Sequence, residues 1–307
     1  MLPVRALVLA LLLFGTAAPA AAHVSSDLLT PGAAWTYDPW LIVPLYVTGI
    51  AFFLGTKNIW RAAGAGRGVR YKHVASFWAG WLILALALVS PLHWLGEHLF
   101  AAHMVEHELL MIVAAPLFAY ARPSNAVIWS LPARFRPSVG SIINSAPILA
   151  LWVFMGHPLS ETILHGAALW LWHAPVLYTL ALSNEAVHRV EHLSFFFTGL
   201  LFWWTLLYGR GADRGERVRD AVAIGCLFLT LLHSGVLGAL LTLSPHVWYP
   251  AQVQFSADFG LSPLEDQQLA GILMWVPMGV VYTAAALFFA HRLLTVQTPR
   301  AFRQHAI

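Results

Sequence analysis

Long apolar stretches alternate with short polar segments along almost the whole chain. A membrane-spanning helix needs about 20 predominantly apolar residues. Seven stretches meet this length, near residues 40–60, 74–92, 98–120, 159–181, 187–208, 220–243 and 267–290. A further stretch, 138–157, is broken by Pro147 and Pro158, and we expect it along the membrane interface or as a buried, broken helix. The pattern predicts an all-α, polytopic membrane protein with seven transmembrane helices.

The composition supports this fold class. The chain is 59% hydrophobic and 10% charged, whereas a soluble domain carries roughly 25% charged residues. The 14 Trp and 18 Phe suit anchors at the lipid–water boundary. The net charge of +3 comes from residues spread over short loops, so nucleic-acid binding is not indicated. The single cysteine, Cys226, excludes an intramolecular disulfide and any metal motif built from paired cysteines.

The N-terminus has the features of a secretory signal peptide over residues 1–22. Arg5 supplies the positive charge, residues 6–14 the apolar core and residues 20–22 a small-residue cleavage site. An uncleaved first helix is the alternative, but the apolar run is short for a span. The expected organisation is a signal peptide at 1–22, an extracytoplasmic segment at 23–39, a membrane domain at 40–291 and a cytoplasmic tail at 292–307.

The basic residues predict the orientation of the helices. Of the 17 lysines and arginines, all but Arg5 and Arg189 fall in one set of alternating loops or in the C-terminal segment. Loops rich in Lys and Arg stay in the cytoplasm. We therefore expect the N-terminus outside and the C-terminus in the cytoplasm.

Two runs of the form His-x-x-Glu-His each open an apolar stretch: residues 103–107 and 188–192. On a helix, positions i, i+3 and i+4 share a face, so each run presents two imidazoles and a carboxylate in one direction. Imidazole is the commonest side-chain metal ligand, and ionisable groups inside membrane helices usually have a function. The runs predict a metal or haem site.

The predicted topology brings histidines of four helices to a similar depth in the outer half of the membrane. The expected metal ligands are His103, His107, His173, His188, His192 and His233. Glu106 and Glu191 are expected to accept hydrogen bonds from ligand imidazoles, to ligate directly or to hold a proton. Asp266, at the mouth of the last helix, is expected to attract cations. Arg189 either neutralises Glu191 or extends outward.

Several kinds of site fit these residues. Imidazole suits zinc, copper and iron, and the methionines at 104, 111, 274 and 278 tilt the choice towards copper. Histidines that face each other from two helices can instead ligate haem, and a purely structural polar network is a third possibility. His-x-x-Glu-His is also the inverted zinc-peptidase signature. No catalytic domain surrounds it here, so we do not expect an enzyme.

Several motifs, in order along the chain, resemble the CtaG family of assembly factors for caa-type cytochrome c oxidase. They are His103-Met104-x-x-His107-x-Leu109-Leu110-Met111, Ala115-Pro116-Leu117, Trp172-His173-x-Pro175-x-Leu177-Tyr178, His188-x-x-Glu191-His192, Phe202-Trp203-Trp204, Leu240-Leu241-Thr242, Trp248-Tyr249, Asp266-Gln267-Gln268-Leu269-Ala270-Gly271 and Met274-Trp275. The similarity spans roughly residues 40–290.

The resemblance implies a protein of the bacterial plasma (inner) membrane that helps to mature a haem–copper oxidase by handling copper. Its expected partners are oxidase subunits, membrane lipid and an extracytoplasmic copper donor. Copper is the expected cofactor, with haem as the alternative. A haem-binding redox protein and a metal-free assembly scaffold remain the alternative functions.

Overall fold

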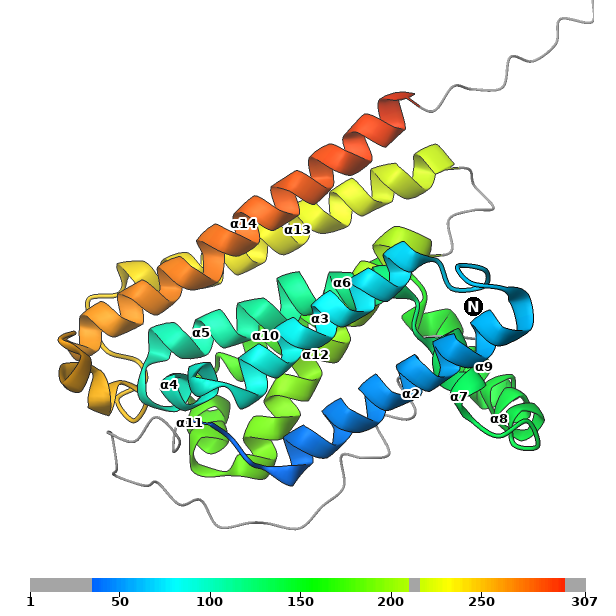
Figure 1. Ribbon diagram of the computed structural model, residues 1–307. Coiled ribbons are helices and arrows are strands. Elements are labelled where there is room, and N and C mark those ends of the chain that lie inside the picture. The colour runs from blue at the N-terminus through cyan, green and yellow to red at the C-terminus, as the bar shows by residue number, and fades with distance from the viewer. Residues whose placement is uncertain (1–34, 210–215, 296–307) are drawn as a thin grey trace, which may run out of the picture.

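The computed structural model describes residues 35–209 and 216–295, and in this part of the chain it contains helices and no strand (Figure 1). The prediction of an all-α fold is confirmed. The predicted signal peptide, residues 1–22, lies outside the described residues, as does the C-terminal segment from residue 296.

Six continuous helical stretches are long and apolar enough to cross a membrane. They are α2 (Pro39–Ala63), α3 (Tyr71–Val89), the stretch formed by α5 (Phe100–Glu108), the π-helical η1 (Leu109–Ala114) and α6 (Ala115–Ala121), then α12 (Glu185–Tyr208), α13 (Glu216–Leu243) and α14 (Pro263–Thr295). The chain is therefore a multi-pass membrane protein.

The remaining helices are short. They are α4 (Pro91–His98), α7 (Ser124–Ser130), α8 (Arg136–Ile143), α9 (Ala146–Met155), α10 (Pro158–Trp172), α11 (Pro175–Ser183) and the 3-10 helix η3 (Val253–Phe259). The pair α8–α9 is bent by 60° and would make a seventh span if it counts as one. This pair occupies the stretch 138–157, for which a buried, broken helix was one of the two expectations. The helix is broken, but only Ile143 and Trp152 of the pair are buried.

Prolines explain where several of these helices begin. Pro147, Pro158 and Pro175 each lie in the first turn of α9, α10 and α11. Proline suits this position because its missing N–H has no partner in a first turn. The predicted span 159–181 is consequently two helices, since the chain breaks at His173 and Ala174 before Pro175.

The span formed by α5, η1 and α6 lies beside α12 and runs in the same direction (Figure 1). Contacts from His107 to His192 and from Met111 to Trp203 follow one another along both helices. Helix α10 runs antiparallel to α12, with His165 opposite Thr198 and Trp172 opposite Ser194. The two His-x-x-Glu-His runs therefore lie at the same level of the bundle.

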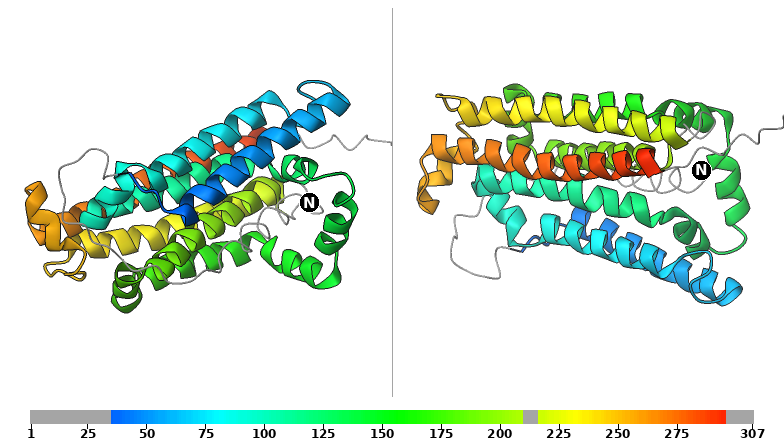
Figure 2. Two further views of the ribbon diagram at one scale, coloured as in Figure 1. Left: turned by 60° about the horizontal axis from the view of Figure 1, so that its bottom comes forward. Right: turned by 90° about the horizontal axis from the view of Figure 1, so that it is seen from above.

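Helices α13 and α14 form a long antiparallel hairpin beside α5 (Figures 1 and 2). Close approach depends on small residues, because a Cβ at Gly238 would lie 2.6 Å from the Cβ of Trp275. Small residues at helix crossings are typical of membrane bundles, where close van der Waals packing drives association.

Candidate metal centre

Four predicted ligand histidines meet between the N-terminal turns of α5 and α12. The rings of His103 and His107 have centroids 4.1 Å apart, and those of His188 and His192 are 4.3 Å apart. Between the helices, His103 lies 5.4 Å from His188, and His107 lies 5.0 Å from His192. His103, His107 and His192 are buried, and His188 is half-buried.

A fifth histidine, His93 of α4, joins this group and was not predicted. Its ring lies 5.9 Å from that of His188 and 6.0 Å from that of His192. The position of His93 between two apolar stretches of the sequence could have indicated it. His93 follows the end of one apolar stretch and precedes the start of the next, so a short loop keeps it beside α5.

The histidines and two carboxylates form three overlapping ligand sets. His103, His188 and His192 make one set; His93, Glu106 and His192 make a second; His103, His107 and Glu191 make a third. Within each set the potential ligand atoms lie within 4.8 Å of one another. Because every set contains His103 or His192, the three sets form one continuous site, which we call the histidine centre.

Within the part of the chain that the structure describes, many polar atoms of the histidine centre are buried without a hydrogen-bond partner. They are Nε2 of His103, His188 and His192, both ring nitrogens of His107, Oε2 of Glu106 and both carboxylate oxygens of Glu191. Leaving a buried polar group unpaired costs about 1–3 kcal/mol. The donor set of neutral imidazole and carboxylate therefore fits a bound transition-metal cation, which would satisfy several of these atoms at once.

The carboxylate of Glu106 orients the centre from within. Its Oε1 lies 2.7 Å from Nδ1 of His93 and 3.7 Å from Nδ1 of His192. Burial alone would lower the pKa of His93, but the adjacent Glu106 carboxylate outweighs it and raises that pKa. Gly96 leaves room for this pair, since a Cβ there would lie 2.9 Å from Oε2 of Glu106.

The π-helical turn η1 begins two residues after His107. Such bulges free a backbone carbonyl and often mark functional sites. Here Trp203 Nε1 donates to the carbonyl of Met111 at 3.0 Å, which ties the bulge to α12. A side chain at Gly199 would also come within 3.4 Å of Met111 Cα. These contacts hold α5 against α12 and fix the level of their histidines.

His173 and His233 lie outside the three ligand sets. His173 Nδ1 donates to the carbonyl of Leu169 at 2.7 Å, and its Nε2 is buried without a partner. Its ring contacts Phe195, which also contacts His107, so it flanks the histidine centre. His233 instead lies beside α10, where a Cβ at Gly166 would come within 3.0 Å of its Nε2.

A second set of buried polar side chains lies on α10, on the part of the helix that meets His233. His165 of α10, adjacent to Gly166, bonds Thr198 Oγ1 through Nδ1 at 2.9 Å and leaves Nε2 unpartnered. Glu161, one turn earlier, is fully buried with both oxygens unpartnered. At 1.5 Å rise per residue, His165 lies about 12 Å along α10 from His173. The unpartnered polar atoms of α10 therefore extend from the histidine centre into the bundle.

The structure gives Asp266 and Arg189 specific partners. Asp266 is fully buried and accepts from the backbone N–H groups of Phe100 and Ala101, at 3.0 and 2.9 Å, and from Ser256 Oγ at 2.7 Å. This favours a capping role at the start of α5 over attraction of cations. Arg189 pairs with Asp38 at 2.9 Å and Glu185 at 2.7 Å, and so extends away from Glu191.

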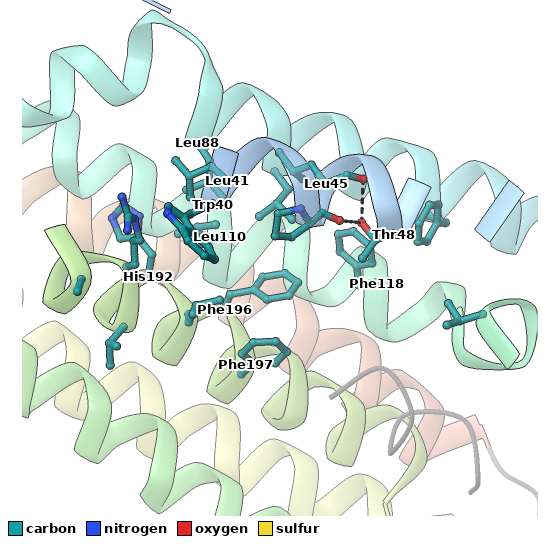
Figure 3. Close-up of a pocket in the computed structure, with 18 residues that line it drawn as sticks. Trp40, Leu41, Leu45, Thr48, Leu88, Leu110, Phe118, His192, Phe196 and Phe197 are labelled. Carbon is teal, nitrogen blue, oxygen red and sulfur yellow. Dashed lines mark hydrogen bonds between the residues drawn. The ribbon is translucent and has the colours of Figure 1, made fainter. Parts of the chain in front are cut away.

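An apolar crevice of about 140 Å³ reaches the histidine centre from the side. It lies between α2, α3 and α12, and Figure 3 shows His192 at one end with Trp40, Leu110 and Phe196 along its walls. One ligand histidine thus borders both the polar centre and this apolar crevice.

The fold and the site together define a multi-pass α-helical membrane protein with a buried, histidine-rich candidate metal centre between parallel helices. A family model described as cytochrome c oxidase caa3 assembly factor matches residues 50–295. The chain belongs to this family, which confirms the resemblance seen in its motifs. It therefore has a role in cytochrome c oxidase assembly and interacts with oxidase components, and this membership indicates a non-enzymatic role. No curated protein and no solved structure matches the chain.

Proposed function

We propose that the protein binds copper at the histidine centre and delivers it to a haem–copper oxidase subunit. The observation that carries this proposal is the convergence of five histidines from three helices. Among the described residues, four of the five have buried ring nitrogens without a partner, and the fifth, His93, bonds Glu106. Copper enters as cargo, from the face that the charge pattern predicts to be outside. Imidazole ligands suit copper, and the role in oxidase assembly supplies a recipient that needs it.

The overlapping ligand sets suit a cargo better than a fixed cofactor. A structural metal site has one closed set of ligands whose outer partners are satisfied. Here His103 and His192 each belong to two of the three sets, and they share one set. A metal ion can therefore change ligands one at a time while it keeps at least one imidazole. Glu106 and Glu191 balance its charge in the buried site.

Three histidines outside these sets extend the proposal. His173 lies next to the histidine centre, and His165 and His233 lie further along α10 and α13. We assign His173 as an accessory ligand. His233 shares no ligand set with the histidine centre, so its role is that of a relay position together with His165.

The first experiment measures metal content and the visible spectrum of detergent-purified protein loaded with Cu(I). Removal of His103 leaves the set of His93, Glu106 and His192, and removal of His192 leaves the set of His103, His107 and Glu191. Each single alanine variant should therefore weaken copper binding, while His103→Ala/His192→Ala should abolish it. His98→Ala is the matched control, because His98 is buried but bonds the carbonyl of Trp94.

Three results would contradict the proposal. Unchanged copper stoichiometry in the double variant would show that the centre is not the copper site. A haem absorption band that disappears in the same variant would identify a haem-binding redox protein. A metal-free wild type, together with rescue of oxidase assembly by a variant lacking all five histidines, would leave a scaffold.

A further inference from the structure

A second open cavity, of about 660 Å³, lies at the opposite end of the bundle from the histidine centre. It forms where α2 ends, α3 begins and α6 and α12 end, which is also the end that the charge pattern predicts to face the cytoplasm. Helix ends of a membrane bundle meet the lipid headgroups. The cavity is therefore at the level of the membrane surface.

The cavity gathers cations from three segments. Arg67 and Arg70 come from the loop between α2 and α3, Lys72 from the first turn of α3, and Arg122 from the end of α6. All four are exposed, and among the residues that the structure describes no carboxylate lines the cavity. Within the described residues, none of the four has an acidic partner within 4.0 Å. Four uncompensated positive charges thus converge on one concave space.

Two of these cations lie over tyrosine rings. The Arg122 guanidinium lies 3.6 Å from the centroid of the Tyr208 ring, and the Lys72 ammonium lies 5.4 Å from that of Tyr120. Arg122 has a left-handed backbone, with φ of 51°, at a helix end where glycine is usual. Among the described residues it alone, apart from glycines, has a positive φ. An arginine at this position indicates that its side chain is needed there.

We propose that this cavity binds a phosphate group, and that the four cations with Tyr120 and Tyr208 form its binding site. Arginine and lysine are the usual ligands of phosphate oxygens. Basic pockets between membrane helices at the cytoplasmic side recognise the headgroups of anionic lipids. The phosphate belongs either to an anionic phospholipid of the surrounding membrane or to a free phosphate compound. The site is independent of the copper proposal.

The test is a binding titration of delipidated, full-length protein in neutral detergent, in which native mass spectrometry measures the bound fraction. One arm adds phosphatidylglycerol, a second adds zwitterionic phosphatidylcholine and a third adds inorganic pyrophosphate. The pocket variant is Arg70→Gln/Arg122→Gln. The control variant is Arg61→Gln/Arg134→Gln, which removes two charges from the same predicted side but outside the cavity.

A cation near the membrane surface contributes about 1 kcal/mol to binding of an anionic lipid, which is about five-fold in affinity. The pocket variant should thus bind phosphatidylglycerol about 25-fold more weakly than wild type, and the control less than about two-fold more weakly. Saturable binding of phosphatidylglycerol that pyrophosphate does not displace identifies a lipid. Displacement by pyrophosphate identifies a free phosphate compound, and either result supports the site.

Equal weakening in the pocket and control variants would overturn the proposal, because the effect would then be one of overall charge. Equal binding of phosphatidylcholine would overturn it too. An Arg70→Lys/Arg122→Lys variant guards against misfolding and should recover part of the affinity. Since His103→Ala/His192→Ala leaves this cavity untouched, its lipid affinity should equal that of wild type even if the copper proposal fails.

Discussion

Replacement of Asp266 is expected to destabilise the protein without removing its metal site. The Asp266 carboxylate is fully buried and accepts three hydrogen bonds, from the N–H groups of Phe100 and Ala101 and from the hydroxyl of Ser256. Asp266→Ala leaves all three donors buried without this acceptor. At about 1–3 kcal/mol for each unpaired donor, and with partial relaxation, the loss should be about 3–5 kcal/mol.

Replacement of Asp266 by asparagine should give an intermediate loss of stability, for a reason that lies in the same hydrogen bonds. Asp266→Asn keeps one acceptor oxygen but turns an amide N–H₂ towards a backbone donor of α5. The variant should therefore lose about 1–3 kcal/mol. The order of unfolding temperatures should be wild type, then Asp266→Asn, then Asp266→Ala. Scanning fluorimetry in detergent measures this order, and copper stoichiometry is measured on the same samples.

Glu97→Ala is the matched control for charge, because Glu97 is an exposed carboxylate of α4 at the same end of the bundle. Its unfolding temperature should stay close to that of wild type. If Asp266→Ala were as stable as wild type, the capping argument would be refuted. If Asp266→Ala had normal stability but bound copper more weakly, the role predicted from the sequence, attraction of cations, would be supported instead.

Three further predictions concern packing and the bound metal. Gly271→Ala should destabilise the α13–α14 hairpin by about 1–3 kcal/mol in thermal unfolding, because its Cβ would lie 2.7 Å from the backbone N of Thr242. Gly279→Ala is the control and should be nearly neutral, because the nearest atom to its Cβ would lie at 3.7 Å. Trp203→Phe should lose about 1–3 kcal/mol in the same assay, because the buried carbonyl of Met111 loses its donor; an unchanged unfolding temperature would contradict this. When free Cu(I) is held at 100 times its dissociation constant, its removal by a chelator should lower the free energy of unfolding by about 2.7 kcal/mol. The double histidine variant should show no change.

The level at which the histidines meet could be predicted from the sequence, because it depends on periodicity and charge alone. Residues 103–107 and 188–192 each begin an apolar stretch, and alternating basic loops require the two stretches to run in the same direction. The structure bears out this parallel arrangement of α5 and α12. Which ring nitrogens face each other depends on how each helix is rotated about its own axis. The sequence did not predict this rotation, and the π-helical turn η1 after His107 departs from the α-helical period on which the prediction relied.

Other features depend on tertiary contacts, which a local pattern indicates only in part or not at all. His93 reaches the centre because α4 folds back over α5 and presents it to Glu106. His233 has the same predicted depth as the ligands, yet it faces Gly166 of α10. From the sequence, Asp266 at the mouth of α14 was predicted to attract cations. Its capping role appears only once α14 is placed beside the first turn of α5.

The surplus of ligands in the histidine centre follows directly from its architecture. Each His-x-x-Glu-His run places three ligand groups on one helix face, and two parallel helices place two such faces opposite each other. One tetrahedral or trigonal ion cannot use all of these groups together with His93. The unused groups remain buried and unpaired, at a cost that packing and capping around α5 must offset. A site that retains spare ligands at this cost is suited to exchange a metal, and this property supports the proposed delivery of copper over its permanent storage.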